Sequence, residues 1–217
     1  MPNVDMLEYV NKSVYFCNRK CSCAQHGYPG NFPEKFDGVL LVGQNPGYAK
    51  HPYGDYKRRI WEYSSREMNF KEFQKLYVDE FLSNRFIGNF YKLYAKEMGL
   101  EPHELTFTNL VKCPNVNNVF EETMIPSCKG FLHTQIEALR PDVIVAFGRY
   151  AIEEFHAQAP YMISHILYPY RDEIKLQSIV SFPHPSRLRN AVKESKKLAE
   201  LVKTAKQFKN KEAVING

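Results

Sequence analysis

The sequence predicts a layered α/β domain with a mostly parallel central sheet. Apolar runs typical of buried strands alternate along the chain with segments whose apolar residues recur at helical spacing. Two of these runs are followed at once by short polar turns, Gly43–Gly47 and His184–Ser186. Turns that leave the carboxyl ends of parallel strands line the ligand crevice of an open sheet. We therefore expect these two turns to face one another in one site, although almost 140 residues separate them.

The first half of the chain is expected to alternate helix and strand. A first helix is expected near 4–17, and the uninterrupted apolar run at 39–42 is typical of a buried strand. Residues 61–98 are rich in helix formers with apolar residues at helical spacing, and 105–109 has the pattern of a second strand.

The second half continues the alternation. A helix at 128–139 is ended by Arg140-Pro141, because proline cannot continue a helix, and a strand follows at 143–147. Gly148 begins a helix through Phe155, 161–176 has the pattern of a strand pair or meander, and a strand at 179–182 precedes His184. A C-terminal helix is expected to bury the apolar residues that recur along it: Leu198, Leu201, Val202, Ala205 and Phe208.

Length and composition indicate one soluble domain. The chain has 217 residues, enough for a sizeable core, and no linker long enough to divide it. No apolar stretch approaches the roughly 20 residues of a membrane span. The segment Met1–Asp5 lacks the basic and apolar regions of a secretory signal. We expect a cytoplasmic protein without a membrane partner.

Two basic sets accompany the expected site. Lys57-Arg58-Arg59 lies among the aromatic residues of 53–63, and the other set follows the His184 turn: Arg187, Arg189, Lys193, Lys196 and Lys197. Each set alone reads equally well as a solvated face. Together, beside one crevice and mixed with aromatic residues, they favour a polyanion with stackable bases, that is, a nucleic acid.

Five cysteines form a second constellation: Cys17, Cys21, Cys23, Cys113 and Cys128. Disulfides are unusual in cytosolic proteins, where clustered cysteines more often bind metal or carry out redox chemistry. Four thiolates suit a [4Fe–4S] cluster or a tetrahedral zinc ion. One cysteine is left over in either case, and we expect it to be Cys21 or Cys23. The alternative is a set of unconnected buried cysteines.

The motifs together resemble the uracil-DNA glycosylases, and most closely their iron–sulfur branch, family 4. The resemblance is carried by six elements in the family's order: Gly43–Gly47, Phe86-Ile87-Gly88, Leu105–Cys113, Cys128 with fourteen residues between it and Cys113, Gln135-Ile136 ahead of Leu139–Gly148, and His184–Ser186. It implies a three-layer α/β/α fold with a four-stranded parallel sheet, spanning 1–217 as one domain with an unusual insertion at about 52–85. It also implies a monomeric, monofunctional glycosylase acting on uracil-containing DNA, single- or double-stranded, nucleoid-associated if the source is prokaryotic.

The resemblance implies a role for each site residue. Asn109 would pair with the edge of a flipped uracil, Phe86 would stack on its ring, and Gln44 would contact the base or a phosphate. His184 would donate a hydrogen bond to O2 of the leaving base, and Asn45 would orient the attacking water. The other implied residues are Gly43, Gly47 and Tyr48 in the pocket wall, Ser186, Arg187 and Leu188 at the DNA, and four of the five cysteines around a [4Fe–4S] cluster, with zinc as the alternative.

Several positions depart from the family-4 pattern. Gln44-Asn45 stands where that branch usually has Glu-Ala, and no acidic residue follows the first glycine turn, where Tyr48 could fill the space. The N-terminal cysteines are not spaced Cys-x2-Cys. Hypoxanthine, or thymine opposite guanine, therefore stays an alternative substrate, and a non-catalytic DNA-binding relative is an alternative function. A nucleotide-binding small-molecule enzyme is disfavoured, because the chain lacks a Gly-x4-Gly-Lys-Ser/Thr loop and Pro46 removes an N–H that a phosphate would use.

Overall fold

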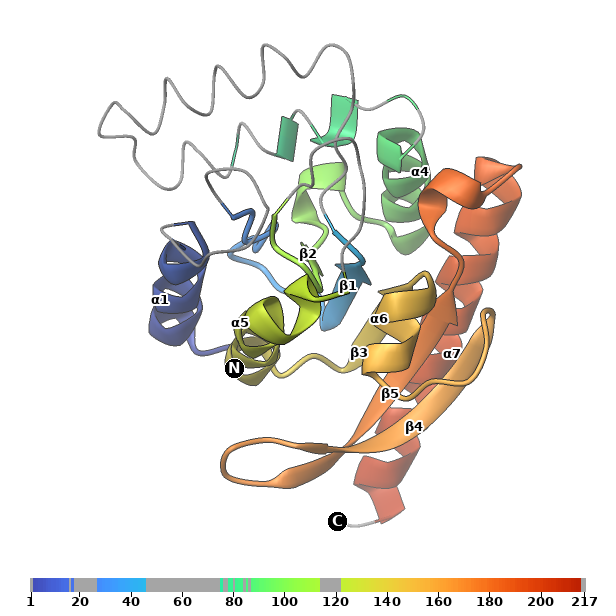
Figure 1. Ribbon diagram of the computed structural model, residues 1–217. Helices are drawn as coiled ribbons and strands as arrows, with labels where there is room; N and C mark the ends of the chain where they lie inside the picture. Colours follow the sequence, from blue (N-terminus) through green and yellow to red (C-terminus); the bar gives the residue numbers. More distant parts are fainter. Residues whose placement is uncertain are drawn as a thin grey trace.

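The computed structural model describes residues 2–15, 17, 27–45, 75, 78–79, 81–83, 85, 87–113 and 122–215. Within these residues a single sheet of five strands lies between two layers of helices (Figure 1). The strands are β1 (Val39–Gly43), β2 (Phe107–Asn109), β3 (Val143–Phe147), β4 (Met162–Pro169) and β5 (Ile174–Phe182). The helices are α1 (Val4–Tyr15), α4 (Ile87–Met98), α5 (Met124–Leu139), α6 (Arg149–Glu154) and α7 (Ala191–Ile215), with short 3-10 turns η1 (Pro102–Glu104) and η3 (Pro185–Arg187). Most of the expected insertion at 52–85 lies outside the described residues.

The strand order is β2-β1-β3-β5-β4. The first four strands of this order pair in parallel, which confirms the predicted parallel sheet. The fifth strand, β4, is an addition to the expected four and runs antiparallel to β5 at the sheet edge. The stretch expected as a separate strand pair is instead β4 plus the first part of β5. Residues 174–176 of β5 are exposed or half-buried, and a polar residue, Gln177, follows them. The sequence therefore gave no sign that they belong to the same strand as the apolar run at 179–182.

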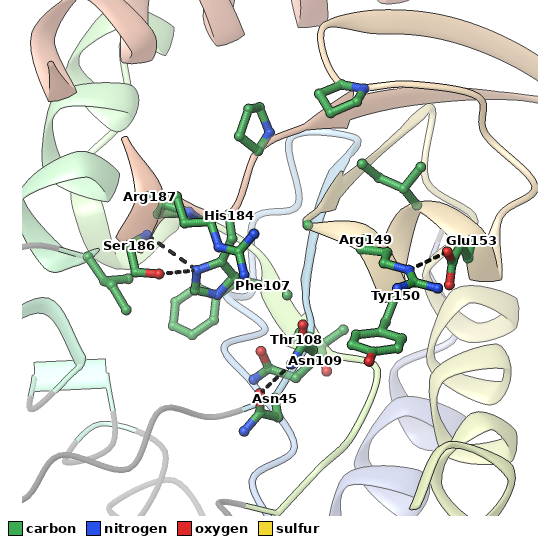
Figure 2. A pocket seen from close by; sticks show the side chains of 18 of the residues that line it. Asn45, Phe107, Thr108, Asn109, Arg149, Tyr150, Glu153, His184, Ser186 and Arg187 are labelled. Atoms are coloured by element: carbon green, nitrogen blue, oxygen red, sulfur yellow. Dashed lines mark hydrogen bonds and ion pairs between the residues drawn. The ribbon is translucent and has the colours of Figure 1, made fainter. Parts of the chain in front are cut away.

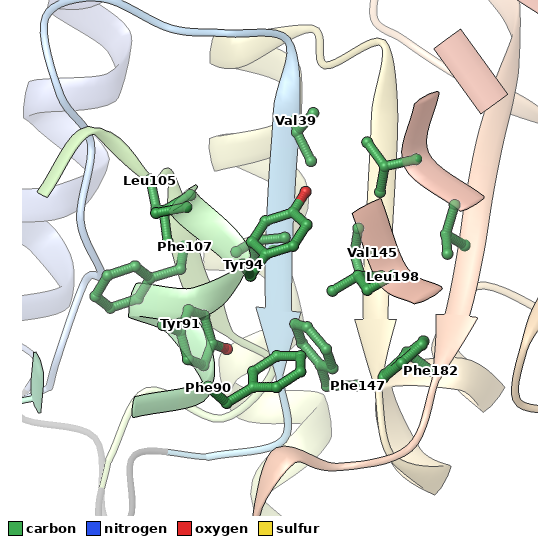
Figure 3. Packing of buried hydrophobic residues seen from close by; sticks show 14 of the residues in the cluster. Val39, Phe90, Tyr91, Tyr94, Leu105, Phe107, Val145, Phe147, Phe182 and Leu198 are labelled. Atoms are coloured by element: carbon green, nitrogen blue, oxygen red, sulfur yellow. The ribbon is translucent and has the colours of Figure 1, made fainter. Parts of the chain in front are cut away.

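Alternate residues of each strand enter two separate cores, because successive strand side chains point to opposite faces. On one face Leu41, Phe107 and Val145 pack beneath α4 and α7 (Figure 3). On the other face Leu40 and Ile144 pack beneath α5 and α6. The helical layers therefore cover both faces, as the near-continuous apolar character of β1 and β3 predicts.

One helix boundary and the burial of one residue differ from expectation. Helix α5 begins at Met124, four residues before the expected Cys128, and ends as predicted at Leu139, with Arg140 in the left-handed region. The C-terminal helix buries Leu198, Val202 and Ala205, but Phe208 is 52% exposed. Its ring lies edge-on against His165 of the edge strand β4, with the ring centroids 5.3 Å apart. None of the described helices is both long and apolar enough to span a bilayer.

Candidate functional site

A cavity of about 750 Å³ opens at the carboxyl ends of the parallel strands. Its lining includes residues 43–45 after β1, Asn109 at the end of β2 and residues 183–187 after β5. The sheet thus brings together the two turns that the sequence predicted to meet, and adds Asn109 beside the first of them, at the end of the neighbouring strand β2. In Figure 2 Asn45 and Asn109 lie between two walls, one with His184, Ser186 and Arg187, the other with Arg149, Tyr150 and Glu153.

The glycine at position 43 is required by the approach of Asn109. The two residues are paired in register across β1 and β2, and a Cβ on Gly43 would lie 2.5 Å from Asn109 Oδ1. Two backbone hydrogen bonds extend this pairing beyond the strands, from Leu110 N to Gly43 O at 2.8 Å and from Val111 N to Gln44 O at 2.9 Å. The Asn109 side chain is therefore held against the first polar turn, 9% exposed, with its amide at the cavity.

Gln44 and Asn45 present amides to the same cavity. Gln44 Nε2 lies 3.4 Å from Asn45 Oδ1, a contact at the long limit of a hydrogen bond. Both side chains are half-buried. An amide donates and accepts hydrogen bonds but does not take a proton near neutral pH, so this pair can orient a polar ligand or a water molecule.

The imidazole of His184 is held in one orientation by its own turn. The Ser186 backbone N–H donates to Nδ1 at 3.3 Å, and Ser186 Oγ lies 2.7 Å from the same atom (Figure 2). Because Nδ1 accepts, the proton of the neutral ring is assigned to Nε2, which is then available as a donor. Burial, together with the positive charge of Arg187, lowers the pKa of His184 below its usual value. The site therefore favours a neutral imidazole that donates one hydrogen bond.

The turn between β3 and α6 lies directly beside this histidine. Gly148 has φ +79°, a left-handed conformation that favours glycine, and a Cβ there would lie 3.3 Å from His184 Cβ. The Gly148 N–H donates to Phe182 O at 2.9 Å, which ties the turn to the end of β5. Gly148 therefore allows β3 and β5 to present their turns side by side.

An apolar wall completes one side of the cavity, and sequence reasoning missed it. It consists of Phe81, Ile87, Tyr91 and Phe107. The Phe81 and Phe107 rings are stacked with centroids 4.6 Å apart, and burial raises the pKa of the Tyr91 hydroxyl. The signal for Phe107 was available, because residues two apart in a strand share a face and Asn109 had been singled out.

The opposite wall comes from α6 and was also missed. Arg149 Nε lies 2.7 Å from Glu153 Oε1, and its guanidinium lies 5.6 Å from the centre of the Tyr150 ring. The Tyr150 hydroxyl donates to Glu122 Oε1 at 2.7 Å. These are polar surface contacts on a six-residue helix, and no sequence motif marks them.

The residues expected at DNA differ in their surroundings. Ser186 and Arg187 are exposed and line the cavity. Leu188 is half-buried, and its side chain packs against the core beneath α4 and α7. Within the described part of the chain, none of the downstream cations Arg189, Lys193 and Lys196 forms an ion pair.

Three of the five cysteines are described, and none of the three forms a disulfide with another described residue. Cys113 and Cys128 are buried in a small shared cluster with Val111 and Met124. Burial, with the neighbouring Cys128 and Cys17 as smaller causes, raises the pKa of the Cys113 thiol to about 12. The fold therefore places Cys17, just after α1, and Cys128 of α5 near enough to Cys113, after β2, to affect its pKa. Among the described residues no group of three or more His, Cys, Asp or Glu side chains is close enough to hold a metal ion, and Cys21 and Cys23 lie outside them.

Lys112, next to Cys113, is a fully buried lysine that the sequence did not single out as functional. Its Nζ donates to Thr108 Oγ1 at 2.7 Å and to Gln135 Oε1 at 2.6 Å. Burial lowers its pKa to about 7, opposed by the nearby Cys128. Of the other predicted site residues, Gly47, Tyr48 and Phe86 lie outside the described residues.

Comparison with known proteins covers most of the chain. A family model described as "Uracil DNA glycosylase superfamily" matches residues 29–209. The chain is 27% identical over 226 residues to the Type-4 uracil-DNA glycosylase of Sulfurisphaera tokodaii, which covers 94% of this chain and 89% of that protein. It is 32% identical over 123 residues to the Type-4 uracil-DNA glycosylase of Thermotoga maritima, covering 54% of this chain and 62% of that protein. The range matched by the family model contains every residue that lines the cavity.

Proposed function

Because the chain belongs to the uracil DNA glycosylase superfamily and resembles its Type-4 members, we propose that it is a monofunctional DNA-repair glycosylase. It flips uracil out of DNA and hydrolyses the N-glycosidic bond, leaving an abasic site. The observation that carries this proposal is the convergence of Asn45, Asn109 and His184 on one cavity at the carboxyl edge of the sheet.

Asn109 reads the base. Its amide can accept from uracil N3–H and donate to O4, a pattern that cytosine reverses. The side chain is nearly buried, and a buried amide left unpaired costs about 1–3 kcal/mol. The apolar wall of Phe81, Tyr91 and Phe107 excludes water from one side of the base, and Phe86 is proposed to stack on its ring, a contact worth about 1–3 kcal/mol.

His184 stabilises the departing base. The C1′–N1 bond breaks with both electrons moving to uracil, so negative charge develops on its O2 while the sugar acquires oxocarbenium character. The Nε2–H of a neutral imidazole donates to that oxygen, and the Ser186 contacts at Nδ1 keep the proton on Nε2. A pre-organised donor of this kind is worth about 10²–10³ in rate.

Asn45 orients the water that completes the reaction. The water oxygen bonds to C1′, and the proton it loses passes to the uracil anion or to solvent. Asn45 lies on the same turn as Gln44, and its carbonyl can accept a hydrogen bond from this water without removing its proton. Gln44 offers its remaining amide contacts to the base or a phosphate.

DNA is proposed to approach over the His184 turn. Ser186 is proposed to lie beside a phosphate, although its one hydroxyl hydrogen is used at His184 Nδ1. The exposed Arg187 is the better candidate to fill the space left by the flipped nucleotide, because Leu188 packs inward. Beyond them the exposed cations at 189, 193, 196 and 197 continue along the start of α7, where a negatively charged backbone can neutralise them.

The cysteines fit a thiolate-bound cofactor, and we propose a [4Fe–4S] cluster in a structural role, with zinc as the alternative. Cys17, Cys113 and Cys128 come from three parts of the fold, and both of the other thiols contribute to the raised pKa of Cys113. Cys21 or Cys23 would complete a set of four. Such a group would supply a cross-link between the N-terminal segment and residues 113–128. Elemental analysis that finds about four irons per chain would support the [4Fe–4S] cluster. Zinc without iron would show that the cofactor is a zinc ion instead.

The decisive experiment is a single-turnover assay on labelled oligonucleotides that carry uracil, hypoxanthine or a G·T mismatch, followed by alkaline cleavage of abasic sites. Abasic product from uracil is the expected result, and tight DNA binding without product would favour a non-catalytic relative. Preferential cleavage at hypoxanthine or at G·T would reassign the substrate. If Asn45→Ala and His184→Ala each left uracil excision within threefold of the parent, the mechanism above would be wrong.

A further inference from the structure

A polar cluster lies behind the base pocket, on the opposite face of the sheet. Asn109 points toward the α4 and α7 side, where Gly43 is its neighbour. Thr108, one residue earlier, points to the α5 side, because successive strand residues alternate. There its hydroxyl oxygen lies 2.7 Å from Pro29 O and 3.0 Å from Gln135 Oε1, to one of which it donates, and it accepts from Lys112 Nζ at 2.7 Å.

Gln135 of α5 closes the cluster. Its Oε1 accepts from Lys112 Nζ at 2.6 Å, and its Nε2 donates to Asn11 Oδ1 of α1 at 2.8 Å and to Pro29 O at 2.9 Å. All four side chains, of Asn11, Thr108, Lys112 and Gln135, are at most 2% exposed. The hydrogen bonds of this cluster therefore join α1, α5, the 27–31 segment and the end of β2.

A buried lysine in such a place calls for a reason beyond packing. Lysine is almost never fully buried unless it is paired, and none of the described hydrogen-bond partners of Lys112 is a carboxylate. An apolar side chain would fill the same volume without the cost of removing an amine from water. What a methyl or methylene group could not do is hold Thr108 and Gln135 at fixed positions.

We propose that Lys112 is a positioning residue for base recognition: by linking Thr108 to Gln135 it fixes the end of β2, and so the position of the Asn109 amide in the pocket. The inference rests on the proposed function, because Asn109 matters as the group that reads uracil. Strand geometry makes the link direct, since Thr108 and Asn109 share one peptide unit and face opposite ways. The same cluster joins the end of β2 to α5, the helix that carries Cys128. Its lysine, Lys112, is followed directly in the sequence by Cys113.

The chain offers a matched control for the test. Thr106 lies two residues before Thr108, is equally buried, and its hydroxyl has no hydrogen-bond partner among the described residues. Thr108→Val and Thr106→Val are thus the same change at neighbouring sites, and only the first removes a member of the cluster. Lys112→Met, of similar length and without an N–H group, removes the centre.

The measurements are inhibition by free uracil and the single-turnover rate of uracil excision, both made well below the thermal midpoint of every variant. We expect Thr108→Val and Lys112→Met to raise the inhibition constant for uracil at least tenfold and to slow excision 10- to 100-fold. Thr106→Val should leave both values unchanged. A purely structural role would instead lower the midpoint while leaving uracil affinity and excision by folded protein at the parent level, and that result would overturn the proposal. Should Lys112→Met fail to fold, Thr108→Val decides the question.

A second readout separates this inference from the proposed function. If the parent neither binds nor excises uracil, the proposed function fails, but the positioning of β2 can still be measured by amide hydrogen exchange. The Leu110 and Val111 amides donate to Gly43 and Gln44, so their protection reports how the strand end is seated. Faster exchange at these amides in Thr108→Val than in Thr106→Val supports the link, and equal exchange rates refute it.

Discussion

Replacing Gly43 with alanine should disable base recognition without unfolding the protein. The added Cβ would lie 2.5 Å from Asn109 Oδ1, whereas ordinary van der Waals contact begins near 3.4 Å. One of the two groups must therefore move by about 1 Å. A displacement of about 1 Å in a positioning group can cost about 100-fold in rate. We expect single-turnover excision of uracil by Gly43→Ala to fall by about that factor.

Stability should change little, because the backbone at Gly43 does not require glycine. Its φ lies outside the left-handed region, and an alanine in a compatible conformation stabilises a fold by about 0.4–1 kcal/mol through the unfolded state. This gain offsets part of the cost of moving Asn109. The thermal midpoint should thus stay within a few degrees of the parent while excision collapses.

Gly130→Ala is the control for this substitution. Gly130 is exposed on α5, and a Cβ there meets no atom within 4 Å. Its replacement should add up to about 1 kcal/mol through helix propensity and leave excision unchanged. If excision by Gly43→Ala instead stayed within threefold of the parent rate, with an unchanged thermal midpoint, the Asn109 amide would not need its observed position. That result would refute the geometric argument for base recognition.

Four further outcomes are expected. His184→Ala should slow single-turnover excision by about 10²–10³, since it removes one pre-organised donor; parent-like rates would exclude that role. The lowered pKa of His184 means that the folded state favours the neutral ring. The contribution of His184 to folding stability is therefore complete above its usual pKa of 6.5 and is lost as the pH falls through the lowered pKa of the folded state. Unfolding titrations at pH 5 to 8 should show a weaker pH dependence of stability in His184→Gln, and curves identical to the parent would contradict this. Arg187→Ala should slow excision from duplex DNA more than from single strands. The Leu188 side chain packs on the core, so Leu188→Ala should lower the thermal midpoint and affect both substrates alike. A duplex-specific defect in Leu188→Ala would instead show that Leu188 fills the space left by the flipped nucleotide. Cys128→Ser should lose bound iron and stability, while at least one of Cys21→Ser and Cys23→Ser should keep the iron content of the parent, as measured by elemental analysis. A full iron content in Cys128→Ser would show that Cys128 is not a ligand.

Much of the site was accessible from the sequence because its residues stand next to unmistakable strands. The apolar runs at 39–42 and 143–147 could only be buried strands, and turns at the ends of parallel strands converge at one edge of the sheet. This reasoning brought the turns of Asn45 and His184 to one cavity, and the family resemblance added Asn109. The same reasoning could not find Arg149 or Tyr150, since exposed polar residues on a short helix carry no periodic signal.

Local patterning also failed where a strand is only partly covered. The exposed side chains of Ile174 and Leu176 concealed the first part of β5, and Phe208 was expected to be buried because helical spacing does not say where the sheet beneath a helix ends. Both errors concern the sheet edge at β4, where burial depends on neighbours distant in sequence.

The amino-acid sequence by itself determined the layered architecture and the polar strand-end turns, because hydrophobic period and turn composition are local properties. The roles proposed for the site residues came from the family resemblance. Only the tertiary structure decided that Asn109 needs a glycine opposite it, that Ser186 holds the His184 ring through Nδ1, and that Lys112 lies in a buried cluster behind the pocket. Each of these depends on strand register or on contact between residues far apart along the chain or across a turn. A lysine next to a cysteine reads as a surface charge until the fold places Thr108 and Gln135 around it.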